Sequence, residues 1–349
     1  PPSAEPAPES ARPRIPIWLT LGAAVLIGVL TAAQARINGQ LGLKLDDAFL
    51  AAFISFGSGL VIIAVLSVVL PSGRRGVGVL VRGVRAGEIP WWMLIGGAAG
   101  AFTVATQGLV VATIGVSLFT VGLVAGQTVS GLLIDRVGFG PSGVVAVTMP
   151  RIAGGALALV AVALSFGGAG VGSIPLWMLV LPFLAGAGIA WQQGANGRLR
   201  DRVGTPLTAT LVNFIGGTFL LGIATLIHVL VEGPPNALPS EWWVYLGGAM
   251  GVTYIFTAAA IVAYTGVLLL GLASIVGQLL AAVLIDLIWP TFDASGDLRS
   301  VLVVAIALAS VVVAVLPSRR RRRSQEGSFR AGPVRPRTKK PSRVFTLDA

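Results

Sequence analysis

The dominant feature of the sequence is a series of long apolar stretches separated by short polar segments. Each stretch holds about 20 residues, the length that an α-helix needs to cross the hydrocarbon core of a bilayer. The pattern therefore predicts an all-α integral membrane protein with ten transmembrane helices. The predicted spans are 17–35, 48–70, 91–112, 115–135, 145–166, 177–197, 207–231, 242–263, 266–288 and 300–316.

The ten spans form two copies of one five-helix unit. Residues 115–135 are similar in sequence to residues 266–286, and this alignment pairs Gln127 with Gln278 and Asp135 with Asp286. An odd number of spans per copy means that the second copy enters the membrane from the opposite side, so we expect two inverted repeats. Further aligned pairs are Gln34 with Gln192, Asn38 with Asn196, Ser55 with Asn213, Phe56 with Phe214, and Gly96 with Gly247.

Composition and the repeat together predict the domain organisation. Short breaks at Ile114-Gly115 and Thr265-Gly266 divide the third span from the fourth and the eighth from the ninth. Segments that are poor in apolar residues do not bury enough surface to fold, and two such segments flank the repeats. The predicted parts are a disordered segment at 1–14, the first repeat at 15–166, a linker at 167–173, the second repeat at 174–317, and a basic disordered cytoplasmic tail at 318–349.

Composition narrows the function classes. Charged residues make up 11% of the chain and hydrophobic residues 55%, whereas soluble domains carry about 25% charge. The chain has no cysteine and one histidine, which argues against disulfides and against thiolate or histidine metal centres. No nucleophile–base set is visible, so we expect no enzyme activity and no cofactor.

The positive charge is concentrated at one end of the chain. The net charge is +11, and eleven of the 25 Lys and Arg residues lie in 318–349. The repeats are therefore only slightly basic, and nucleic-acid binding has no support. The tail itself fits either binding to anionic lipid at the cytoplasmic surface or a solvated topology signal.

The placement of Lys and Arg also predicts the orientation. With both termini in the cytoplasm, 22 of the 25 basic residues fall on the inner side, and only Arg36, Lys44 and Arg299 fall outside. Cytoplasmic loops carry an excess of Lys and Arg, which favours this arrangement. The sequence thus predicts a multi-pass protein of the cytoplasmic (inner) membrane.

The best substrate-binding candidates are Gln127 and Gln278, one in each repeat near the middle of a span. An amide without a partner costs several kcal/mol in hydrocarbon, so these side chains should face protein, water or ligand. Either they line a central cavity, which is favoured, or they form hydrogen bonds between helices. The small residues at Gly122, Gly126 and Ser130 predict close helix packing beside Gln127.

Further substrate-binding candidates lie at the ends of the first and sixth spans. Gln34 and Asn38, like Gln192 and Asn196, stand one helical turn apart on one face. They would hydrogen-bond a substrate at the two gates, with Gln193 as an alternative to Gln192. For the asparagines, capping of the helix ends before a glycine is the favoured alternative. Asn213 is a further cavity candidate.

Three ionisable residues are candidate proton carriers or sensors. Asp135 and Asp286 end their spans, where a carboxylate stays hydrated, so the interpretation as interfacial anchors is favoured over proton transport. His228 has no counterpart in the first repeat, and a pH-sensing role for it is the less favoured interpretation.

The five-plus-five layout, the "Q…NG…L" ends of the first and sixth spans, and the "GQ…LID" of the fourth and ninth resemble the drug/metabolite transporter superfamily. The nearest resemblance is to the YdcZ-type inner-membrane family in a duplicated form. It implies two helical bundles, a central cavity lined by the first four helices of each half, and export as the direction. Small multidrug pumps of the superfamily carry a glutamate in their first helix, and here the first and sixth spans hold no acidic residue.

Taken together, these features predict a secondary transporter that works by alternating access and exports a small polar or amphiphilic metabolite. Two alternatives stay open. One is a flippase for a lipid or a lipid-linked group. The other is a membrane scaffold or sensor that uses the tail to bind a partner. A homodimer also stays open.

Overall fold

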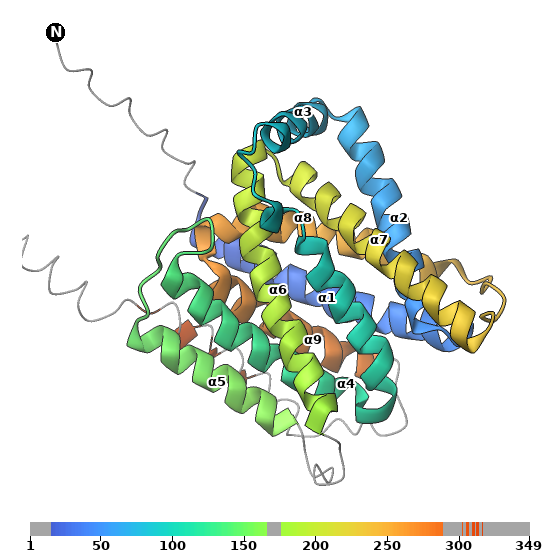
Figure 1. The fold of residues 1–349 in the computed structure, drawn as a ribbon. Coiled ribbons are helices and arrows are strands. Elements are labelled where there is room, and N and C mark those ends of the chain that lie inside the picture. Colours follow the sequence, from blue (N-terminus) through green and yellow to red (C-terminus); the bar gives the residue numbers. More distant parts are fainter. Residues whose placement is uncertain are drawn as a thin grey trace, which may run out of the picture. The chain divides into compact units, whose positions relative to one another are not determined.

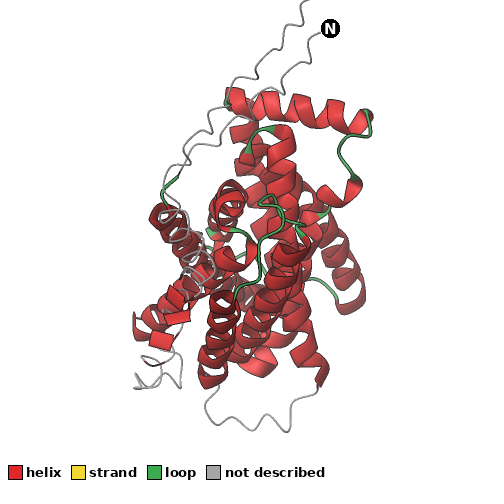
Figure 2. Cartoon of the chain, turned by 90° about the vertical axis from the view of Figure 1, so that its left-hand side faces the viewer, coloured by secondary structure: helices red, strands yellow, loops and turns green. Residues whose placement is uncertain are grey.

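The computed structural model describes residues 15–165, residues 176–288 and eight positions between 302 and 316. Every regular element in this part of the chain is helical (Figure 2), so the all-α prediction is confirmed for it. The α-helices are α1 (Ile17–Leu45), α2 (Ala48–Val69), α3 (Pro71–Arg85), α4 (Gly96–Val137), α5 (Met149–Ser165), α6 (Leu176–Val203), α7 (Pro206–Glu232), α8 (Gly247–Thr265) and α9 (Val267–Ile288), and two short 3₁₀ turns are η1 (Trp91–Met93) and η3 (Trp242–Tyr245).

Several predicted parts lie outside the described residues. These are the N-terminal segment 1–14, the linker 167–173, the tail 318–349 and most of the tenth span. Among the described residues, four helical stretches are long and apolar enough to cross a membrane: 17–45, 48–69, 206–232 and 242–265. A membrane protein is therefore well supported, while the count of ten spans stays a prediction.

The second helix of each repeat begins at an equivalent capping residue. Asp47 accepts a hydrogen bond from the backbone N–H of Leu50 at 2.9 Å, and Thr205 accepts one from that of Leu207 at 3.3 Å. Such side-chain oxygens satisfy backbone N–H groups that have no partner within the first helical turn. Both caps fix the corner at which the chain leaves the first helix of a repeat and enters the second.

Helix α1 extends ten residues beyond its predicted span, to Leu45, and α6 extends to Val203. Hydropathy marks where a helix leaves the apolar environment, not where its hydrogen bonding ends, and Gln, Arg and Leu all favour helix. Asn38 and Asn196 therefore lie well inside helices. The favoured expectation that they cap helix ends is wrong.

Helix α3 was not predicted. Its four arginines at 74, 75, 82 and 85 give it the appearance of a loop in a hydropathy scan. Its buried positions are glycines, and Gly76 lies so close to Thr208 of α7 that a Cβ would stand 2.3 Å from the hydroxyl oxygen. The absence of side chains at these glycines lets α3 lie across the ends of α2, α6 and α7 (Figure 1).

Helix α4 covers both the third and the fourth predicted spans, because Gly96–Val137 is assigned as one helix without a break at Ile114-Gly115. A straight helix of 42 residues would be about 63 Å long. Yet its first residue contacts the side chain of Gln192, while Ile134 lies beside Gly194, only two residues further along α6. Since both ends of α4 meet the same part of α6, the chain turns within this stretch and forms two helical arms (Figure 1), in agreement with the two predicted spans.

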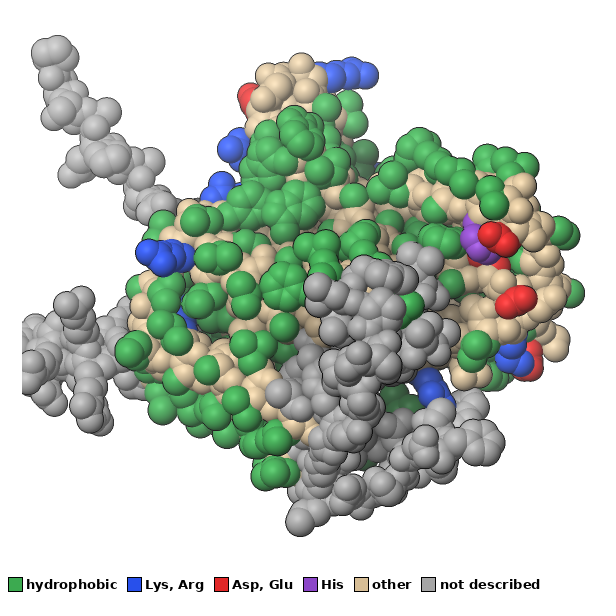
Figure 3. All heavy atoms as spheres, turned by 60° about the horizontal axis from the view of Figure 1, so that its bottom comes forward, with side chains coloured by type: hydrophobic (Ala, Val, Ile, Leu, Met, Phe, Trp, Pro, Cys, Tyr) green, Lys and Arg blue, Asp and Glu red, His purple; other side chains and the backbone are tan. Residues whose placement is uncertain are grey.

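Apolar side chains face outward as well as inward. Leu230 is 76% exposed, and Val68 and Phe219 are each 67% exposed. Figure 3 shows hydrophobic side chains over much of one face of the molecule, with charged side chains mostly at its margins. Helices that are apolar on all sides are typical of membrane spans, which agrees with the prediction of an integral membrane protein.

One ion pair joins the end of α1 to the second repeat and predicts a pH effect. The Lys44 ammonium donates to the Glu241 carboxylate, and this bond holds the pKa of Glu241 below its ordinary value. Because the pKa is lower in the folded protein, the pair stabilises it above the ordinary carboxyl pKa, and that contribution is lost as the pH falls through the lowered value. We expect a small effect, since both side chains are partly exposed.

The measurement is the melting temperature of the purified protein against pH, for wild type and Glu241→Gln. The wild type should lose slightly more stability than the variant between neutral pH and about pH 4. Parallel curves for the two proteins would contradict a contribution from the Lys44–Glu241 pair.

Candidate functional site

Buried polar side chains gather where the two repeats meet, in two equivalent clusters. Each cluster contains one glutamine and one asparagine from the first helix of a repeat and one polar residue from its second helix. All six side chains except Gln34 are below a tenth exposed. The first amide cluster is Gln34, Asn38 and Ser55 against Gly247 of α8, and the second amide cluster is Gln192, Asn196 and Asn213 against Gly96 of α4.

The second amide cluster is held by Gln192. Its Nε2 donates to the backbone oxygen of Gly96 at 3.1 Å and to Oδ1 of Asn213 at 3.2 Å. Asn213 is fully buried, and its Nδ2 has no hydrogen-bond partner among the described residues. A Cβ on Gly96 would stand 2.5 Å from Oδ1 of Asn196, so any larger residue at the start of α4 would displace the asparagine side chain.

The first amide cluster has the same geometry, but here the glutamine comes from the first repeat and the glycine from the second. Nε2 of Gln34 donates to the backbone oxygen of Gly247 at 2.8 Å. Oδ1 of Asn38 would stand 2.1 Å from a Cβ on Gly247. Oδ1 of Asn38 and Oγ of Ser55 both lack a hydrogen-bond partner among the described residues. Ser55 replaces the amide of Asn213, so the two clusters differ in one donor group.

Between the clusters, Phe56 of α2 and Phe214 of α7 pack with ring centroids 5.2 Å apart. Each ring lies against a glycine of the other helix, Phe56 on Gly217 and Phe214 on Gly59. Each repeat thus makes the same phenylalanine–glycine contact with the other. The aromatic pair therefore separates two polar clusters of nearly the same composition.

Gln127 and Gln278 lie apart from these clusters, at two close helix crossings. A Cβ on Gly186 would stand 1.8 Å from the backbone oxygen of Leu123 and 2.9 Å from the backbone N of Gln127. The equivalent Gly28 lies against the backbone of Ser274 and of Gln278 in the same way. The predicted small-residue packing is confirmed on α4, where Gly126 lies against the backbone of Phe183 and Ser130 donates to the carbonyl of Ala187, and no hydrogen bond among the described residues joins the two glutamines.

Both glutamines are nonetheless buried within the molecule. Gln127 is 5% exposed and Gln278 is 7% exposed. Oε1 of Gln127 has no hydrogen-bond partner among the described residues. Gln193, the neighbouring alternative to Gln192, is 7% exposed and makes no side-chain hydrogen bond with the described residues.

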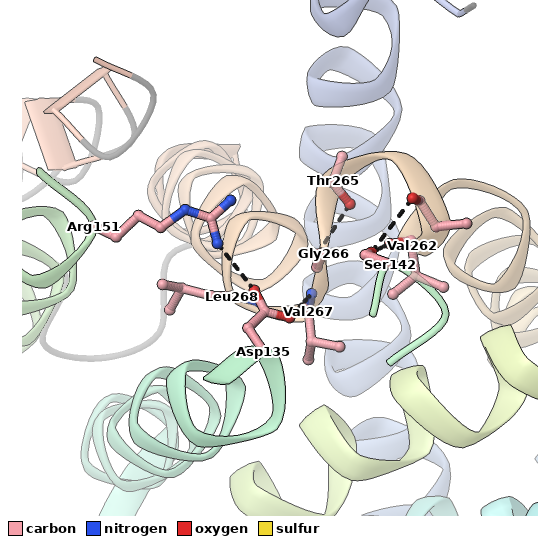
Figure 4. Close-up of polar contacts among 9 residues, drawn as sticks. Asp135, Ser142, Arg151, Val262, Thr265, Gly266, Val267 and Leu268 are labelled. Carbon is pink, nitrogen blue, oxygen red and sulfur yellow. Dashed lines mark hydrogen bonds and ion pairs between the residues drawn. The ribbon is translucent and has the colours of Figure 1, made fainter. Parts of the chain in front are cut away.

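Asp135 was expected to be a hydrated anchor, and the structure places it elsewhere. Its carboxylate is 2% exposed and accepts hydrogen bonds from the backbone N–H groups of Val267 at 2.8 Å and Leu268 at 3.3 Å (Figure 4). Arg151 of α5 pairs with it at 3.2 Å. Asp135 therefore caps α9 from the other repeat, whereas the side chain of Asp286 lies outside the described residues.

Ser142 is a contact residue that sequence reasoning missed. Its hydroxyl lies within hydrogen-bond distance of the backbone oxygens of Val262, at 3.1 Å, and Ala263, at 3.3 Å. A serine in a loop gives no sequence signal for such a contact. His228, a candidate from the sequence, has its Nδ1 3.3 Å from Oδ2 of Asp47.

The chemistry of the site is that of neutral hydrogen bonding. Within the described ranges, no group of three or more His, Cys, Asp or Glu residues is placed to hold a metal ion. The clusters offer amide and hydroxyl groups, some of them without partners, in an apolar protein interior. Such groups orient a solute without reacting with it.

Buried amides between two apolar helical repeats are also found in membrane transporters, whose sites lie at repeat interfaces. The profile of the family described as "Putative inner membrane exporter, YdcZ" matches residues 19–164 and again residues 177–314. The chain therefore belongs to the YdcZ exporter family and contains two fused copies of its unit.

One solved crystal structure supports the fold. It shares 21% sequence identity with this protein at a TM-score of 0.57, over 86% of this chain and 97% of the other. A comparison with curated proteins found no match.

Proposed function

We propose that the protein is a secondary transporter that exports a small polar or amphiphilic metabolite across the cytoplasmic membrane by alternating access. The observation that carries the proposal is the pair of amide clusters. In each, the glutamine of one repeat holds a glycine carbonyl at the start of a helix in the other repeat. Two equivalent contacts between repeats allow two equivalent states, which alternating access requires.

The order of contacts along the helices supports inverted repeats. Gly126 lies beside Phe183, and further along both helices Gly138 accepts from Arg198, so the second half of α4 runs in the direction of α6. Because the end of α4 meets the beginning of α9, corresponding helices of the two repeats run in opposite directions.

The positions of charged side chains support cytoplasmic termini. Arg151 and Arg198 gather with Asp135 at the end of the molecule where α4 ends and α9 begins. The Lys44–Glu241 pair belongs to the segments predicted on the outer side. The excess of arginine at the first end fits the cytoplasmic surface.

The buried amides and hydroxyls, several of them without partners, favour a substrate with neutral hydrogen-bonding groups. Asn38, Ser55, Gln127 and Asn213 each keep an atom without a partner among the described residues. A solute that satisfies such atoms gains binding energy, because a buried polar group without a partner costs about 1–3 kcal/mol. These residues are the substrate-binding candidates, together with Gln34, Gln192, Asn196 and Gln278.

The test compares metabolites inside and outside cells that express wild type or the double variant Gln127→Ala with Gln278→Ala. We expect one solute to accumulate outside with wild type and not with the double variant, at equal membrane levels of the proteins. Gln40→Ala, a change at a partly exposed amide on α1, is the matched control and should export like wild type.

Each other outcome has a defined meaning. Equal export by wild type and the double variant would remove the two glutamines from the site and leave the transporter. If wild type shifts no solute, the same strains are tested for altered lipid distribution between leaflets. A lipid change would replace metabolite export with the flippase alternative, and no change in either assay would favour the scaffold or sensor.

A further inference from the structure

The corner between α8 and α9 exposes backbone donors that only the other repeat satisfies. Gly266 has φ of 73°, a left-handed conformation that glycine adopts without a Cβ penalty. The turn leaves the N–H groups of Val267 and Leu268 without partners inside α9, as at every helix start. Both donate to the carboxylate of Asp135, which ends the fourth span of the first repeat.

The contact at this corner extends beyond Asp135. Ser142, in the loop after α4, contacts the carbonyls of Val262 and Ala263 at the end of α8. Pro141 lies beside Gly197 of α6, where a Cβ would stand 2.6 Å from its ring. Figure 4 shows Asp135 pointing from α4 to the start of α9, with Ser142 on the other side of the corner. One end of the molecule is thus held by polar contacts between the repeats.

The equivalent position of the first repeat also lies in a stretch where the chain reverses direction. Gly266 aligns with Gly115, which lies inside α4, and both ends of α4 meet the same part of α6, whereas the second repeat has a distinct helix end at Thr265. At the Gly266 corner, the N–H groups of Val267 and Leu268 are held by a carboxylate of the other repeat.

We propose that Asp135 is a positioning residue that latches one gate of the transporter. With its carboxylate on Val267 and Leu268, the end of the molecule formed by α4, α8 and α9 is closed. Release of these two hydrogen bonds lets the corner at Gly266 separate from α4 and opens that end. This inference rests on the proposed transport function, since a latch acts on a gate.

The test measures access to the interior on the side that Asp135 closes. The chain has no cysteine, so Leu270→Cys introduces the only thiol, at a fully buried position one turn into α9 from the corner. Alkylation by a membrane-impermeant maleimide is followed in inside-out vesicles for Leu270→Cys alone and with Asp135→Asn. We expect labelling to become about tenfold faster, the shift that loss of one charge-assisted hydrogen bond makes in a two-state equilibrium.

Two further variants keep the result clear. Ser142→Ala removes only the neighbouring contact and should speed labelling in the same direction by a smaller factor. Asp201→Asn changes a carboxylate that pairs with the adjacent Arg200 and should leave the rate unchanged. If Asp135→Asn does not yield monodisperse protein, the Ser142→Ala rate decides, and a rate equal to wild type overturns the latch.

Different results would contradict the latch and the proposed transport function. A wild type that moves no solute removes the function, whatever the labelling shows. A transport-active wild type whose Asp135→Asn variant is monodisperse and labels at the unchanged rate removes the latch alone. In that case Asp135 serves only as a structural cap of α9.

Discussion

Replacing Gly28 with alanine is expected to destabilise the protein by about 3 kcal/mol or more. The new Cβ would stand 1.8 Å from the backbone oxygen of Ser274, so α1 and α9 would have to separate. Overpacking in a well-packed interior costs about 1–3 kcal/mol when side chains can adjust. Here the obstacle is backbone, which cannot rotate away. Gly277→Ala should behave alike, since its Cβ would meet the oxygen of Val25 at 1.9 Å.

Helix α1 offers a control for this prediction. Gly22 on α1 is exposed, and a Cβ added there would meet no atom of the described residues within 4 Å, so alanine there should be neutral or slightly stabilising. Thermal unfolding of the purified variants in detergent measures the difference. A melting temperature of Gly28→Ala equal to that of Gly22→Ala would contradict the close crossing of α1 and α9.

Replacing Gln192 with leucine is expected to reduce the initial transport rate by about tenfold or more. The change leaves Oδ1 of Asn213 without its donor and removes the second hydrogen bond of the Gly96 carbonyl, which keeps its partner inside α4. A buried acceptor without a partner costs about 1–3 kcal/mol, and about 1.4 kcal/mol corresponds to a factor of ten. Gln34→Leu should have a smaller effect, because Gln34 donates to the single carbonyl of Gly247.

The assay is uptake or release of the exported solute by liposomes that contain equal amounts of each variant. Gln193→Leu is the matched control, because Gln193 is the next residue of α6 and is similarly buried, but its side chain makes no hydrogen bond with the described residues. We expect it to retain most of the activity. Equal losses at 192 and 193 would indicate a general effect of glutamine removal on α6, and the second amide cluster would lose its functional role.

Several features of the site were predictable because they depend on the repeat. The alignment of Gln34 with Gln192 and of Ser55 with Asn213 already placed polar groups at matching points of two apolar units. Their pairing with Gly247 and Gly96 was not predictable, because those contacts join residues more than ninety positions apart. The glycines themselves appeared in the sequence only as aligned pairs.

The helix ends were the weakest part of the prediction. Asn38-Gly39 and Asn196-Gly197 resemble helix stops, but α1 and α6 continue past them. Local sequence favoured a cap, whereas packing of these helices against the other repeat keeps them helical. The prediction that Asp135 is a hydrated anchor was also wrong because of tertiary packing, since its hydrogen-bond partners on α9 are 132 and 133 residues away.

The sequence by itself determined that this is a helical membrane protein made of two copies of one unit, because apolar length and repetition are properties of the chain alone. The tertiary structure decided which buried polar groups meet. It brought Gln192 to Gly96 and Asp135 to the α8–α9 corner, since hydrogen bonds between repeats depend on how the helices pack.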